Sequence, residues 1–157
     1  IFSFILIVFF NFNACTGYKP IFGTTNLDFK ISNYLIQGNK LLGNKIYSQL
    51  YLLSKSNKKS QNKRGIDLVI NTSEGKVVLS KNSAGKILSY KITLNTIIKI
   101  NDYLSDETIL DKTFTFSSTY KTQDQYSDTI ELERKTINDL LEKTYENLLI
   151  SLTQTIL

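Results

Sequence analysis

The residues of this chain that are able to do chemistry are few, and they exclude several kinds of site. The sequence holds one cysteine, Cys15, and no histidine. An ordinary zinc site, a Ser-His-Asp triad and a Cys-His pair all need residues that are missing here. The acidic pair Asp106 and Glu107 falls in a predicted turn, and no Gly-rich phosphate-binding loop is present. We therefore expect no catalytic residues, no metal and no cofactor, and a protein that is not an enzyme.

The cysteine lies directly behind an apolar N-terminal run. Residues 1–10, IFSFILIVFF, are apolar except for Ser3. They are too few for a transmembrane helix, which needs about 20 residues, but they are typical of the hydrophobic region of a secretion signal. Ala14 supplies the small residue that a cleavage site requires. Because the chain begins with Ile and contains no Met, we expect a start Met and a basic region upstream.

The pair Ala14-Cys15 resembles a bacterial lipobox, in which the cysteine thiol is acylated and becomes the new N-terminus. Two or three acyl chains would anchor the protein stably, since each buried CH2 contributes about 0.8 kcal/mol. The sequence thus predicts a signal peptide at residues 1–14, lipidation of Cys15 and a tether at residues 15–24. The alternative is a buried free cysteine behind a general signal peptide. Thr16 stands where Asp would signal inner-membrane retention, which favours the periplasmic face of the outer membrane.

The formal net charge of the chain is +5, and lysine carries most of it. This charge permits nucleic acid, anionic lipid or lipopolysaccharide as a partner and selects none of them. The densest basic cluster is a polar loop containing Lys58, Lys59, Lys63 and Arg64. We interpret it as a solvated loop and expect no nucleic-acid partner, because no aromatic residues are interleaved for base stacking.

Hydrophobic periodicity predicts the elements that follow the tether. Alternation of apolar and polar residues indicates strands, and apolar residues at helical spacing indicate helices. Gly43 makes the first turn of the first helix uncertain, Gly75 suggests a bulge, and Ser127 or Asp128 is the expected N-cap of the last helix. The predicted strands cover residues 27–32, 66–80, 87–100 and 108–120, and the predicted helices cover residues 39–53 and 128–157.

Clean alternation is typical of antiparallel strands with one buried face and one solvent-exposed face. The buried face needs a cover, which the two amphipathic helices supply. We therefore predict an α+β fold for a single domain at residues 25–157. It is a two-layer sandwich in which a four-stranded, mainly antiparallel sheet is covered by two helices, in the order β-α-β-β-β-α. Such a sheet keeps at least one free edge, which favours a partner.

Several lysines fall on the predicted exposed face or at turns. In the strand ILSYKITLNTIIKI, Lys91 and Lys99 lie opposite the apolar set Leu88, Tyr90, Ile92, Leu94, Ile98 and Ile100. Lys81 and Lys86 flank the turn before this strand, so we expect the four lysines to form one cationic patch. Lys76 is a further candidate of the same kind. The alternative for each lysine is a solvated side chain that only maintains solubility.

The whole pattern resembles a known family. The segment ACTGYKPIFG is similar to the Cys-Gly-aromatic-basic-Pro-Leu-Tyr-Gly start of alphaproteobacterial LPS-assembly lipoproteins, the LptE family. Downstream, the family's layout is matched by a strand with Tyr90 and Leu94, a strand ending in Ser118, Thr119 and Tyr120, and a helix opened by Tyr126. The resemblance covers most of the chain after Ala14, and it depends on the order and spacing of these motifs.

The resemblance implies a non-enzymatic role in lipopolysaccharide (LPS) transport. Family members plug the large outer-membrane barrel of the LPS translocon, the LptD partner, assist its assembly and bind LPS during export. For this chain, Lys81, Lys86, Lys91 and Lys99 would then contact LPS, whose headgroup carries phosphates and carboxylates. The alternative is a periplasm-facing lipoprotein that serves as a small binding module without an LPS role.

Overall fold

The computed structural model of the chain describes residues 27–56 and 63–156. The predicted signal peptide, the tether and Cys15 lie outside these residues, as do Lys58 and Lys59. The described elements follow the predicted order β-α-β-β-β-α. They are β1 (Phe29–Gly38), α2 (Lys40–Ser56), β2 (Arg64–Lys81), β3 (Ile87–Asp102), β4 (Thr108–Lys121) and α3 (Tyr126–Ile156).

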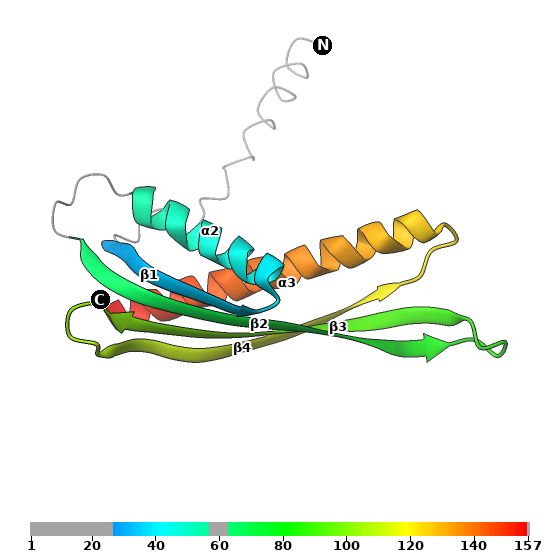
Figure 1. The fold of residues 1–157 in the computed structure, drawn as a ribbon. Helices are drawn as coiled ribbons and strands as arrows, with labels where there is room; N and C mark the ends of the chain where they lie inside the picture. The colour runs from blue at the N-terminus through cyan, green and yellow to red at the C-terminus, as the bar shows by residue number, and fades with distance from the viewer. Residues whose placement is uncertain (1–26, 57–62, 157) are drawn as a thin grey trace, which may run out of the picture.

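The strands form one four-stranded sheet in the order β1-β2-β3-β4. Strand β1 runs parallel to β2, while β2–β3 and β3–β4 are antiparallel. Figure 1 shows α2 and α3 on the same side of this sheet. The predicted two-layer α+β class with a mainly antiparallel sheet is therefore confirmed.

The core lies between the sheet and the two helices. The predicted phase of β3 is confirmed, because Ile92, Leu94, Ile98 and Ile100 are all buried. Leu88 has the same phase but is 43% exposed, since it lies in the part of the sheet that the helices leave uncovered. The helices contribute residues at the expected spacing, including Leu42, Ile46, Leu50, Leu140, Leu141, Leu148 and Leu152.

Strand β1 extends six residues beyond the predicted end at residue 32, and it stops for identifiable reasons. Gly38 has a φ of 69°, a conformation that favours glycine, and a Cβ there would clash with the carbonyl oxygen of Thr72. The side chain of Asn39 then accepts a hydrogen bond from the amide of Leu42 at 3.3 Å, which is N-cap geometry. Helix α2 therefore begins at Lys40.

Two local predictions were wrong. Helix α3 begins at Tyr126, so Ser127 and Asp128 lie in its first turn and neither is the N-cap. The carbonyl of Gln125 accepts the amide of Thr129 instead. The bulge expected near Gly75 is also displaced: the β2–β3 register shifts between Val78 and Lys81.

Candidate functional site

The longest unbroken run of exposed residues in the described chain, residues 73–86, lies in the distal hairpin. We define the distal hairpin as residues 73–91, which join the end of β2 to the start of β3. Every β2 residue from Ser73 to Lys81 is exposed. Figure 1 shows the hairpin tip extending beyond the start of α3. The strand end beyond Thr72 is exposed along its whole length, so the distal hairpin is a candidate interaction surface.

The tip of the distal hairpin is a well-formed turn. The side-chain oxygen of Asn82 accepts hydrogen bonds from the amides of Ala84 at 3.0 Å and Lys86 at 2.9 Å. Gly85 supplies the positive φ, 81°, that the turn needs. Lys81 and Lys86, both exposed, are thereby held on either side of the tip.

Two further cations lie near this tip on the open face of the sheet. Lys91 faces Thr119 across the β3–β4 ladder, and Lys121 faces Ser89. Lys91 and Lys121 are thus diagonal neighbours on one face, a relation that places residues about 7–8 Å apart. Sequence reasoning missed Lys121 because it lies on another strand, and only the register brings it beside Lys91.

Lys99 does not join this group. It lies eight residues along β3 from Lys91, roughly 27 Å away at about 3.4 Å per residue, and it faces Asp111. The exposed face predicted for Lys91 and Lys99 is confirmed, since both alternate with the buried residues of β3. The expectation of a single patch of four lysines was wrong: Lys81, Lys86 and Lys91 lie in the distal hairpin, and Lys99 lies elsewhere.

Lys76 lies in the exposed part of β2, but its side chain is held against α3. Its Nζ lies 2.5 Å from Oε2 of Glu133 in α3, and the hydroxyl of Tyr120 donates to the same oxygen at 2.8 Å. The ammonium also lies 4.4 Å from the ring centroid of Tyr90. This cluster joins β2, β3, β4 and α3, and it attaches the base of the distal hairpin to the helix layer.

Lys76 and Glu133 each stabilise the charged form of the other. Burial would lower the pKa of Lys76, but hydrogen bonding to Glu133 and Tyr120 outweighs it and raises that pKa. Burial alone would raise the pKa of Glu133, and the hydrogen bonds from Lys76 and Tyr120 lower it instead. Both groups therefore stay charged at neutral pH, so Lys76 serves first as a structural cation.

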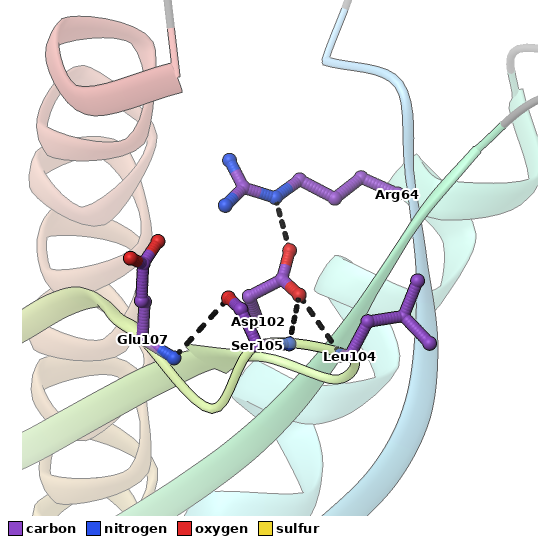
Figure 2. Close-up of polar contacts among 5 residues, drawn as sticks. All are labelled: Arg64, Asp102, Leu104, Ser105 and Glu107. Carbon is purple, nitrogen blue, oxygen red and sulfur yellow. Dashed lines mark hydrogen bonds and ion pairs between the residues drawn. The ribbon is translucent and has the colours of Figure 1, made fainter.

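A second ionic cluster organises the opposite end of the sheet, at the β3–β4 turn. One carboxylate oxygen of Asp102 accepts hydrogen bonds from the amides of Leu104 and Ser105, both at 2.9 Å (Figure 2). Its other oxygen contacts Nε of Arg64 at 2.5 Å. The hydrogen bond from Arg64, followed by those from Ser105 and Leu104, holds the pKa of Asp102 far below its usual range.

The β3–β4 turn is shaped by its own polar residues. The Asp106 carboxylate accepts the side-chain amide of Asn101 at 3.2 Å, and Asp106 has a φ of 57°. The amide of Glu107 donates to the hydroxyl of Ser105. Asp106 thus takes part in turn chemistry, as the sequence predicts for the pair Asp106 and Glu107, and the turn presents Leu104 with 90% of its surface exposed.

The described residues hold neither a cluster of metal ligands nor a membrane-spanning helix. Within residues 27–56 and 63–156, no three His, Cys, Asp or Glu side chains converge in a way that could hold a metal ion. No helix in the same ranges is both long and apolar enough to cross a membrane.

Comparison with known proteins finds likeness at the level of structure. No protein-family model matches the chain, and no curated protein sequence is significantly similar to it. The fold is similar to the crystal structure of rare lipoprotein B from Shewanella oneidensis, with 14% identity and a TM-score of 0.54. That match covers 78% of this chain and 95% of the other.

Two further solved structures show the same likeness. Minor lipoprotein from Acinetobacter baumannii matches at 13% identity and a TM-score of 0.58, over 82% of this chain and 93% of its own. Lipoprotein B from Nitrosomonas europaea matches at 11% identity and a TM-score of 0.56, over 85% of this chain and 88% of its own. At these identities the comparisons establish the fold, which this chain shares with solved bacterial lipoproteins.

Proposed function

We propose that this chain is an outer-membrane lipoprotein of the LPS transport machinery. In this role it plugs the LptD-type barrel, assists the assembly of that barrel and binds LPS during export, without enzymatic activity. The observation that carries the proposal is the fold shared with bacterial lipoproteins over about four fifths of the chain. The sequence resemblance to the LptE family supports the finer assignment.

The distal hairpin is the proposed LPS contact. Its residues 73–91 carry four lysines and one glutamate, Glu74, so it presents excess positive charge to anionic headgroups. Lys81 and Lys86 are exposed beside the tip, and Lys91 is half-buried on the open face. Each exposed ion pair contributes at most about 1 kcal/mol, so these lysines act as a group. Lys99 would contact LPS at a separate position on the open face.

The proposed anchor is an acylated Cys15 on the periplasmic face of the outer membrane. Intact-mass measurement of membrane-extracted protein should show a mature chain that begins at Cys15 and carries acyl groups. Cys15→Ser should abolish the acyl mass and release the protein from the membrane fraction. A mature chain that keeps residues 1–14, or that starts elsewhere without acyl groups, contradicts the proposal.

The partner assignment is tested by co-purification. The full chain, extracted from envelope membranes in mild detergent, should co-purify with a large LptD-type barrel and bind purified LPS. If the chain binds neither the barrel nor LPS, the alternative gains support, namely a periplasm-facing lipoprotein that binds something else. Binding to the barrel without LPS would retain the plug role and remove the LPS role.

A further inference from the structure

The distal part of β2 has a free backbone edge. Strand β1 pairs with β2 only up to Gly38, opposite Thr72, whereas β2 continues to Lys81. Beyond Thr72, β3 pairs with one edge of β2, and no described strand pairs with the other. Strand β1 ends at this point because Gly38 takes a positive φ and Asn39 caps helix α2. The free edge of β2 is therefore a consequence of the fold.

The direction of the backbone groups on this edge follows from one hydrogen bond. The carbonyl of Thr72 accepts the amide of Asn39 at 2.6 Å, so the backbone of Thr72 points towards the β1 side. Along a strand, the backbone amides and carbonyls of successive residues point alternately towards one edge and the other. The amides and carbonyls of Glu74, Lys76 and Val78 therefore point out along the free edge, while the alternate residues bond to β3.

The surroundings leave this edge accessible. Val77 is 57% exposed and Val78 is 42% exposed. A Cβ built on Gly75 meets no atom within 4 Å, so no contact within the described chain requires glycine there. A glycine inside a strand often marks a place where another backbone approaches closely. The register shift after Val78 ends the regular edge, which confines the usable stretch to residues 74–78.

We propose that residues 74–78 of β2 accept an extended, acidic segment of the barrel partner by strand addition. This proposal rests on the proposed function, which supplies the barrel. Strand addition satisfies unpaired amides and carbonyls with main-chain hydrogen bonds. Glu133 neutralises Lys76, but Lys81, Lys86 and Lys91 leave the distal hairpin positively charged. This charge selects an acidic segment and opposes a second copy of this chain, whose hairpin carries the same charge.

The test substitutes one outward-pointing residue in two ways. Val78→Pro removes the amide donor on the free edge without removing a hydrogen bond to β3, since proline is tolerated on edge strands. Val78→Thr keeps both the amide and the β-branched shape, and it is the matched control. Both variants of the full chain are purified in detergent, checked by circular dichroism and titrated against the purified barrel partner.

We expect Val78→Pro to weaken binding to the barrel by about tenfold or more, because a main-chain hydrogen bond is lost and the added strand is displaced. Val78→Thr should bind within about twofold of the parent.

Hydrogen exchange at single-residue resolution gives an independent readout. In the complex, the amides of Glu74, Lys76 and Val78 should exchange at least about tenfold more slowly than in the free chain. The amides of Ser73, Gly75 and Val77, already bonded to β3, should change little.

The outcomes separate the two proposals. If the parent chain does not bind the barrel, the proposed function fails. If the parent binds while Val78→Pro binds equally well and the three amides gain no protection, strand addition alone is overturned. If the parent instead forms a dimer that Val78→Pro dissociates, the edge pairs with a second copy and the acidic segment is the wrong occupant.

Discussion

Two threonines on the core face of the sheet are buried without a hydrogen-bond partner. Thr72 and Thr96 face each other across the β2–β3 ladder, and both are fully buried. Neither hydroxyl oxygen has a partner among the residues that the structure describes. A buried polar group without a partner destabilises the folded state by about 1–3 kcal/mol.

We expect Thr96→Val to stabilise the protein. Valine keeps the branched shape and removes the unpaired hydroxyl, so the free energy of unfolding should rise by about 1 kcal/mol. This corresponds to an increase of about 4 °C in the melting temperature, measured by circular dichroism. Thr144→Val is the control, because the Thr144 hydroxyl donates to the carbonyl of Leu140 at 2.8 Å. A lower melting temperature for Thr96→Val would contradict the prediction.

Asp102 should make stability depend on pH in the acid range. Its pKa is lowered in the folded state, so its stabilising effect is complete above the unfolded-state value of about 3.9. The effect is lost as the pH falls from that value towards the folded-state pKa. Asp102→Asn can still accept the amides of Leu104 and Ser105 but loses the ion pair with Arg64.

A plot of melting temperature against pH should therefore have a different slope for the parent and for Asp102→Asn. As the pH is lowered from neutral into the range below about 3.9, the melting temperature of the parent should fall more steeply than that of Asp102→Asn, because an asparagine side chain does not titrate. At neutral pH the variant should be the less stable of the two. Parallel curves would mean that Asp102 is not stabilised as its contacts with Arg64 and the turn amides indicate.

The sequence was sufficient to predict the type and order of the strands and helices. Strands β3 and β4 alternate over more than a dozen residues, and such long periodic signals are specific. Their ends depended on contacts that no local pattern contains. Strand β1 continues past residue 32 because it pairs with β2 as far as Gly38, where Thr72 stands opposite.

The role of Gly43 depends on a tertiary contact that helix propensity does not predict. Glycine disfavours helix, yet Gly43 lies in the first turns of α2, and a Cβ there would lie 2.5 Å from Cγ2 of Ile36 in β1. The glycine therefore allows α2 to approach the sheet closely. Replacing Gly43 with alanine has two opposed effects on stability. Better helix propensity stabilises by about 1 kcal/mol, whereas overpacking destabilises by about 1–3 kcal/mol.

We expect overpacking to dominate in Gly43→Ala. The free energy of unfolding should fall by about 1 kcal/mol, because Ile36 is β-branched and its methyl group cannot move far without a strained rotamer. In the background Ile36→Ala, which removes that methyl group, Gly43→Ala should instead be neutral or stabilising. Chemical denaturation of the four proteins gives the coupling energy directly. Additive effects would exclude the contact as the cause.

The candidate site was only partly predictable from the sequence. Lys81, Lys86 and Lys91 are placed correctly on a turn and an exposed face by sequence pattern alone. Lys121 and the Lys76–Glu133 contact depend on which residues of β4 and α3 meet the distal hairpin, and the pattern of a single strand does not contain that pairing. The lipidation of Cys15 remains a prediction, because that residue lies outside the described part of the chain.

The proposed LPS contact of the distal hairpin is testable by charge reversal, measured against a control variant of the same net charge. Replacing Lys81, Lys86 and Lys91 with Glu changes the formal charge by 3 × −2, from +5 to −1. The same replacement at the exposed residues Lys30, Lys40 and Lys135 gives the same net charge without touching the hairpin or Lys99, the other proposed LPS contact. Three exposed ion pairs at up to about 1 kcal/mol each would together account for up to about a hundredfold in affinity.

We therefore expect the hairpin variant to bind purified LPS up to about a hundredfold more weakly than the parent, and the control variant to lose much less. The difference should shrink as salt is raised, because exposed charges are screened over about 8 Å at physiological ionic strength. Equal losses in both variants would mean that LPS responds to net charge and not to a site. Unchanged binding in the hairpin variant would move the contact to another surface, with the loop that contains Lys58 and Lys59 as the next region to test.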